Sequence, residues 1–162
     1  DSSPFRAAIG WAVKEGITNG TSATTFSPGN TCTTAQILTF LWRANGSPNS
    51  NAACPASDVA ETSPFYKALC WANEKDLMTK GSGSTPCTRA AAVTYLWKLA
   101  GSPKMSVNSS FTDVPASADF AQAVAWAVEQ GVTNGVSASE FAPDSTCTRG
   151  QIMTFLYRNL LD

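Results

Sequence analysis

The most unusual polar residues in this sequence are two arginines that stand in the same local context. The stretches "TPCTRAAAVTYLWKL" and "STCTRGQIMTFLYRN" each lead from a threonine into an apolar pattern, so Arg89 and Arg149 are predicted in the first turn of a helix. Positive charge there opposes the helix dipole, at a cost of about 0.3–1 kcal/mol if exposed. A guanidinium beside the free N–H groups of a helix start favours binding of a carboxylate or phosphate. An ion pair with a neighbouring segment, or extension into solvent, are the alternatives.

Helix capping explains the threonines in these stretches. In "TTAQ" and "TRGQ" a threonine is followed three residues later by glutamine, which is the spacing of a capping box. We therefore predict capping boxes at Thr33 with Gln36 and at Thr148 with Gln151, and a cap without the glutamine partner at Thr88. Capping leaves the two arginines unexplained.

These segments belong to a unit that occurs three times. Residues 4–46 align without a gap on residues 119–161, displaced by 115 positions, and a third copy between them has lost about five loop residues. A single copy cannot bury its own second helix, so we expect one cooperative domain over residues 1–162. The expected repeats span approximately 1–48, 56–103 and 111–162, with connectors at 49–55 and 104–110.

Each copy is predicted to be a helix, an irregular loop and a second helix. Ser3 and Ser63, each followed by proline, predict the starts of first helices, and Gly16 and Gly131 predict helix ends. The second helix is apolar around most of its girth, which is typical of a helix buried among others. The predicted fold class is all-α, with three helix-loop-helix repeats in a pseudo-three-fold arrangement, a central helical bundle and three lobes.

The order of "AVAWAVEQGVTNG", a loop ending "FAPDSTCTRGQ" and a helix "IMTFLYR" resembles the S-layer homology module, whose hallmark is a "TRAE"-like box at its second helix. The resemblance implies a three-pronged spindle and non-covalent anchoring of exported proteins to the cell wall of Gram-positive bacteria. The implied ligand is an anionic secondary cell-wall polysaccharide, in some cases pyruvylated. The implied ligand-binding residues are Arg89 and Arg149 of the box, and Asn19, Gly20, Asn134 and Gly135, for which turn formation is the alternative role.

Several positions depart from the pattern of the family. The first copy has Thr34 in place of the box arginine, and the third has Gly150 and Gln151 where alanine and glutamate are usual. The second copy has lost most of its loop. These departures support an alternative function, in which the fold is an interaction module that binds another protein or a surface ligand.

The composition of the chain argues against binding to nucleic acid, membrane insertion and catalysis. A net charge of -1 and 14% charged residues predict no binding to nucleic acid, and no apolar run is long enough for membrane insertion. The chain has no histidine and its carboxylates are scattered, so we expect no enzyme activity, no catalytic residues, no cofactor and no metal site. We expect a monomeric module of a longer protein at the cell wall or cell surface, with the signal peptide outside this chain.

The five cysteines cannot all pair within one chain because their number is odd. Cys32, Cys87 and Cys147 recur two positions before the box arginine position and are expected to be small buried hydrophobic residues. Cys54 and Cys70 are peculiar to the second copy. One disulfide within that copy could pair Cys70 with Cys87 or use Cys54, and the sequence does not choose between these pairings.

Overall fold

A computed structural model describes residues 3–107 and 110–160 of the chain. This part contains six α-helices and no strand, which confirms the all-α class. Each copy supplies two helices, as predicted, and residues 108 and 109 of the predicted second connector lie outside the described residues. The helices are α1 (Arg6–Lys14), α2 (Thr34–Ala44), α3 (Tyr66–Glu74), α4 (Arg89–Leu99), α5 (Ala121–Glu129) and α6 (Arg149–Leu160).

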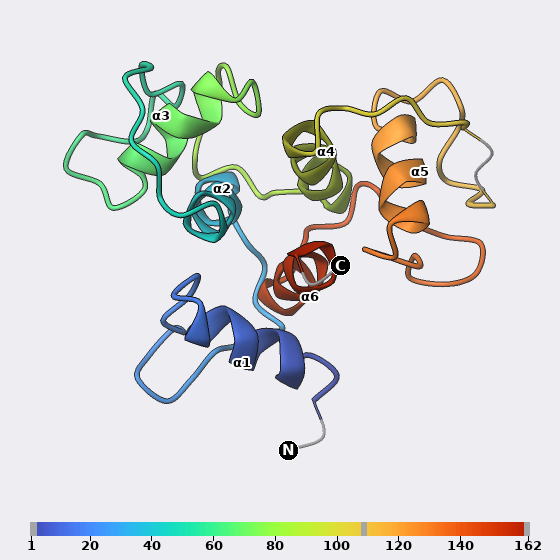
Figure 1. Ribbon diagram of the computed structural model, residues 1–162, viewed down its shortest axis with the longest axis horizontal. Coiled ribbons are helices and arrows are strands. Elements are labelled where there is room, and N and C mark those ends of the chain that lie inside the picture. Colours follow the sequence, from blue (N-terminus) through green and yellow to red (C-terminus); the bar gives the residue numbers. More distant parts are fainter. Residues whose placement is uncertain (1–2, 108–109, 161–162) are drawn as a thin grey trace.

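The second helices of the three copies lie at the centre and the first helices lie outside them. Figure 1 shows α2, α4 and α6 in the middle, with α1, α3 and α5 and their loops in three lobes around them. Each outer helix packs against the central helix of the preceding copy: α3 against α2, α5 against α4, and α1 against α6. The last of these contacts joins the first copy to the third. The pseudo-three-fold symmetry that would relate the copies stays a prediction.

The predicted caps of the central helices are confirmed. At the start of α2, Gln36 N–H donates to the Thr33 hydroxyl (3.3 Å) and Thr33 N–H donates to the Gln36 side chain (2.9 Å). The same pair of bonds joins Thr148 and Gln151 before α6, at 3.2 and 3.0 Å. Thr88 caps α4 through its hydroxyl alone. Local sequence therefore determines where these helices begin.

The outer helices begin later than the serine-proline pairs suggest. At α1 the Arg6 N–H donates to the Ser3 carbonyl (3.1 Å), so Ser3 opens a turn that precedes the helix. The same bond joins Tyr66 to Ser63 (3.1 Å) before α3. The predicted helix end at Gly16 is confirmed: the glycine follows the cap of α1 with φ +70°. A left-handed residue at this position is the usual way to terminate a helix.

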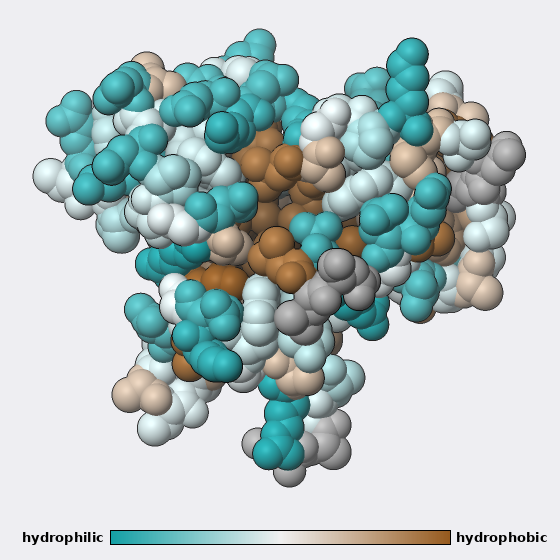
Figure 2. Space-filling model, in the orientation of Figure 1, coloured by the Kyte–Doolittle hydropathy of each residue, from teal (hydrophilic) through white to brown (hydrophobic). Residues whose placement is uncertain are grey.

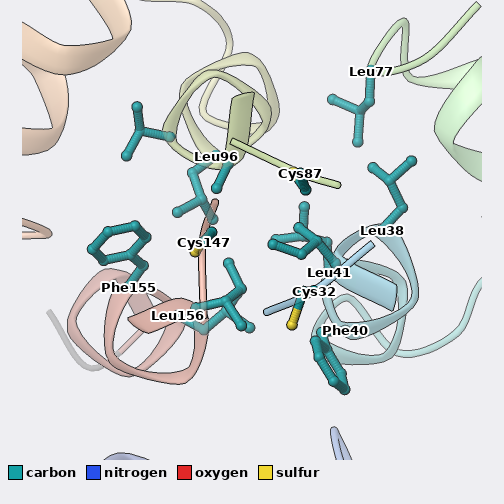
Figure 3. Close-up of a cluster of buried hydrophobic side chains, with 14 of the residues drawn as sticks. Cys32, Leu38, Phe40, Leu41, Leu77, Cys87, Leu96, Cys147, Phe155 and Leu156 are labelled. Carbon is teal, nitrogen blue, oxygen red and sulfur yellow. The ribbon is translucent and has the colours of Figure 1, made fainter. Parts of the chain in front are cut away.

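One hydrophobic core extends through all three copies. Its fully buried side chains include Leu41 of α2, Leu96 of α4 and Leu156 of α6, which lie near one another between the central helices (Figure 3). Figure 2 shows hydrophobic residues gathered between the lobes, whereas the outer parts of the lobes on this face are mostly hydrophilic. Burial of this shared apolar surface is the main term that can hold the copies together.

Three cysteines form a closed ring of backbone hydrogen bonds at the centre of the molecule. Cys32 N–H donates to Cys147 O (3.0 Å), Cys147 N–H to Cys87 O (2.8 Å), and Cys87 N–H to Cys32 O (2.9 Å). Their side chains are buried between the central helices (Figure 3), which confirms that they are small core residues. Burial raises the pKa of Cys32 to about 11 and that of Cys87 to about 12, so both thiols stay protonated and unreactive at neutral pH.

Because the core and the ring include every copy, we expect the chain to unfold in one cooperative transition. Unfolding in urea, followed by far-ultraviolet circular dichroism and by tryptophan fluorescence, should give superimposable curves. Ile37→Ala, a change at a fully buried position of the first copy, should destabilise the whole chain by about 2–5 kcal/mol. Two separate transitions, with only one shifted by the substitution, would contradict a single cooperative domain.

Candidate functional site: the junctions between copies

Each central helix begins against the loop of the next copy. At α6, the Arg149 N–H donates to Asn30 O (2.8 Å) and the Gly150 N–H to Pro28 O (2.9 Å), both in the first copy. The expectation of free N–H groups at these helix starts is therefore wrong, because carbonyls of the neighbouring copy already occupy them. The corresponding bonds join Arg89 to Ser145 (2.9 Å) and Ala90 to Pro143 (3.1 Å) at α4, and Thr34 to Thr85 (2.8 Å) and Ala35 to Gly83 (2.9 Å) at α2.

The box arginines lie in the interior at two of these junctions. Only 3% of Arg89 and 6% of Arg149 is exposed, so neither side chain extends into solvent. Arg149 Nε donates to Phe26 O and Arg89 Nε donates to Phe141 O, both at 2.9 Å. Burial lowers the pKa of both guanidinium groups. Neither takes part in an ion pair among the described residues. The side chain of each arginine thus holds the loop of the next copy by a hydrogen bond to a backbone carbonyl of that loop.

Each buried guanidinium also lies over aromatic rings of the copy to which it binds. The Arg149 Cζ is 4.6 Å from the ring centre of Phe26 and 5.5 Å from that of Phe40. The equivalent distances for Arg89 are 4.8 Å to Phe141 and 5.5 Å to Phe155. Cation–π attraction is strongest where water is excluded, so these contacts offset part of the cost of burying the charge.

The loop of the second copy lacks the ring and the free carbonyl that such an arginine would bind, and this explains Thr34. When the copies are aligned on Cys32 and Cys87, the position of Phe26 is taken in the second copy by Gly81, which has no ring. The Gly81 carbonyl already accepts a hydrogen bond from Ser57 N–H (3.2 Å). Thr34 instead donates its hydroxyl to Thr85 O (3.0 Å). The exchange of arginine for threonine therefore matches the shortened loop that faces it.

Gly150 has a similar explanation in the junction between the third and first copies. A Cβ at this position would lie 2.7 Å from the nearest atom of the Phe5 ring, closer than such contacts are found. An alanine would thus require Phe5 to move away from α6. The glycine lets the start of the first copy pack directly on the third.

Two aspartates that the sequence reasoning did not select organise the loops. Asp113 accepts hydrogen bonds from Phe141 N–H (3.0 Å) and Ala142 N–H (2.7 Å), next to the residue that Arg89 fastens. Burial pushes the pKa of Asp113 up, but these bonds and the charge of Arg89 outweigh it and lower the pKa overall. Asp58 accepts bonds from residues 82–84 in the second copy, and these lower its pKa. The sequence signal that could have identified both aspartates is the recurrence of "SDV" at residues 57–59 and "TDV" at residues 112–114.

A buried threonine links Arg149 to the predicted turn at Asn19 and Gly20 of the first copy. Arg149 Nη2 donates to the Thr18 hydroxyl at 3.4 Å, and the Gly20 N–H donates to the same oxygen at 3.2 Å. Thr18 was not among the predicted site residues. Asn19, between these two residues, is exposed to solvent. Arg149, Asn19 and Gly20 therefore form one connected group at this junction.

The equivalent group at the junction of the second and third copies is incomplete. Gly135 N–H donates to the Thr133 hydroxyl (3.2 Å), and Asn134 is exposed as its counterpart is. Arg89 Nη2, however, is buried without a hydrogen-bond partner among the described residues. Arg89 thus reaches the neighbouring copy through Phe141 and is not joined to the turn through Thr133.

Two cavities lie near these residues, one within the lobe of the first copy and one between the second and third copies. A cavity of about 230 Å³ lies beside the turn of the first copy and is lined by Val13, Asn19, Gly20, Ser22, Ala23, Thr24, Thr25 and Phe26. Its Phe26 wall is the residue that Arg149 fastens. A cavity of about 300 Å³ between the second and third copies includes the carboxylates Asp119 and Asp144. The residues aligned with these two aspartates at the other junction are the uncharged Pro4 and Gly29.

These features define an all-α repeat module in which each copy holds the loop of the next. Comparison with known protein families matches residues 1–38 and 110–153, together just over half of the chain, to the S-layer homology domain. The chain belongs to the S-layer homology domain family, which is associated with anchoring to the cell wall or cell surface. A comparison with curated proteins returned no match. Within the described residues, every helix is too short or too polar to cross a membrane.

Loss of a buried arginine should weaken the fold. Arg149→Ala removes a charge-assisted hydrogen bond and two ring contacts between the third and first copies, so we expect a loss of about 2–4 kcal/mol in the free energy of unfolding. Urea unfolding measures this. Arg6→Ala, at an exposed position of α1, is the matched control and should change stability by less than about 0.5 kcal/mol. An equally small effect at Arg149 would show that the guanidinium does not hold the junction.

Insertion of the family arginine into the first copy should be harmful. Thr34→Arg places a guanidinium opposite Gly81, which lacks the loop ring of Phe26 or Phe141 and whose carbonyl is already bonded. The change also removes the Thr34 hydroxyl bond. We expect destabilisation of about 2 kcal/mol or more from the unpaired charge and the added volume. Thermal unfolding of the variant beside the parent chain measures this. A stabilised Thr34→Arg variant would contradict the match between arginine and loop.

Proposed function

We propose that this chain anchors an exported protein non-covalently to the bacterial cell wall by binding an anionic secondary cell-wall polysaccharide. Membership of the S-layer homology family supports a role at the wall or cell surface. The observation that carries the finer proposal is the connected group of Arg149, Thr18 and the exposed Asn19 at a junction between copies. The proposed role requires neither catalysis nor a cofactor.

In this proposal the two exposed asparagines and the two arginines act differently. Asn19 and Asn134 present amide groups to solvent and would contact sugar hydroxyl or carboxylate oxygens directly. Arg149 and Arg89 lie behind the turns, where they supply positive charge and hold the walls in place. A charge at low dielectric acts on a nearby anion more strongly than one in water does.

The difference in local charge favours the junction between the third and first copies as the principal site. Asp119 and Asp144 line a cavity at the same junction as Arg89, whereas the residues aligned with them at the junction of the third and first copies, Pro4 and Gly29, are uncharged. Like charge across a binding site opposes association. We therefore assign the stronger site to Arg149, Asn19 and Gly20, and the weaker one to Arg89, Asn134 and Gly135.

The test is binding to purified walls of Gram-positive bacteria, before and after chemical extraction of the secondary polymer. We expect binding to untreated walls and its loss on extraction. Asn19→Ala should weaken binding about fivefold, the effect of about one neutral hydrogen bond, with unchanged thermal stability. Asn134→Ala should have a smaller effect. Asn51→Ala, at an exposed position of the first connector, is the matched control and should have none.

The alternative function makes the opposite prediction. An interaction module for another protein or a different surface ligand would keep its binding to walls that have lost the polymer. Binding that survives extraction would therefore contradict the polysaccharide proposal and favour this alternative. If binding is lost on extraction but is unaffected by Asn19→Ala or Asn134→Ala, the proposed function would stand. The assignment of the binding site to these turns would then be contradicted.

A further inference from the structure

The first connector is held along α3 by two hydrogen bonds, one donated by α3 and one by the connector. Asn73 of α3 donates its side-chain amide to Ala53 O (2.9 Å), and Ser50 donates its hydroxyl to Cys70 O (3.3 Å). Cys70 and Asn73 are three residues apart, so they lie on the same face of α3. Cys54 follows Ala53 directly. The connector therefore carries Cys54 across the helix face on which Cys70 stands.

The two thiols lie in different surroundings. The Cys54 thiol donates to Ala56 O (3.8 Å), whereas burial, followed by the neighbouring Cys54, raises the pKa of Cys70. Cys54 is half-buried and Cys70 is buried, so a small oxidant would reach Cys54 first. Cys87, the competing partner in the second copy, lies in the ring at the centre of the molecule, where its backbone is bonded to Cys32 and Cys147. The geometry thus separates one pair of cysteines from the other three.

We propose that Cys54 and Cys70 are a redox-sensitive pair that forms a disulfide and fastens the first connector to α3. With a small-molecule disulfide as oxidant, the Cys54 thiolate attacks one sulfur and releases one thiolate. The Cys70 thiolate then attacks Cys54 Sγ in the mixed disulfide and releases the second. The two cysteines lose two protons and two electrons in all, and the oxidant is reduced to two thiols.

The disulfide would strengthen the junction that has no arginine. The loop between Cys54 and Cys70 includes Asp58, whose carboxylate holds residues 82–84. Gly83 in that segment accepts the Ala35 N–H at the start of α2. Closing the loop therefore limits the motion of the segment that joins the second copy to the first. Thr34 occupies this junction in place of the arginine, so a disulfide within the second copy would support the junction indirectly, through Asp58 and residues 82–84.

The experiment is oxidation of the intact folded chain by oxidised glutathione, followed by alkylation of free thiols, proteolysis and mass spectrometry. We expect one peptide that contains Cys54 to be linked to one that contains Cys70, with a mass two hydrogen atoms below the sum of the two reduced peptides. The other three cysteines should be alkylated only after unfolding. Closure of a loop of this length should raise the melting temperature of the oxidised chain by about 5–10 °C over the reduced one.

Two variants test the role of position. Cys54→Ser should abolish the difference in melting temperature between oxidised and reduced samples. Asn73→Ala keeps both thiols but removes the bond to Ala53, and should slow disulfide formation several-fold. A Cys70–Cys87 linkage in the peptide map would overturn the proposal, and so would a Cys54–glutathione adduct that does not resolve. Wall binding plays no part in these measurements, so their failure would leave the proposed anchoring function untouched.

Discussion

The ring of three backbone hydrogen bonds between Cys32, Cys87 and Cys147 is the constraint on which the rest of the structure depends. A peptide N–H and C=O buried at the centre must be paired, and the backbone of each cysteine is paired with cysteines of the other two copies. The ring brings the starts of the three central helices together. Small side chains suit this position because the chains approach closely there, as Figure 3 shows. From this point each copy meets the loop of the next.

The junctions that follow from the ring turn the box arginines into internal connectors. A guanidinium in the first turn opposes the helix dipole, but Arg89 and Arg149 reach a carbonyl and an aromatic ring of the neighbouring copy. Asp113 completes one junction by holding the backbone beside Phe141. In the proposed site, a change at either arginine would therefore alter stability as well as binding. The exposed asparagines of the turns are better suited to testing binding by itself.

Differences among the copies give the junctions different properties. The junction of the third and first copies joins Arg149 to Thr18 and has the uncharged Pro4 and Gly29 where that of the second and third has Asp119 and Asp144. The junction of the first and second has no arginine but has the connector that carries Cys54 across α3. A chain of identical repeats would have three equal junctions. Here the three junctions differ in their arginine, in the charge at two aligned positions and in the connector that crosses α3.

The sequence alone determined the repeats, the all-α class, the family and the caps of the central helices. These depend on local spacing: Thr33 with Gln36 lies within one turn, and apolar periodicity reports a buried helix before its partners are known. Asp113, Thr18 and the role of Arg149 could not be predicted in this way, because their partners lie in other copies. Only the tertiary structure decided that Arg149 meets Phe26, 123 residues away along the chain, and that Thr34 faces a loop without a ring. Such pairings depend on how the copies close around the ring of cysteines, which no local pattern records.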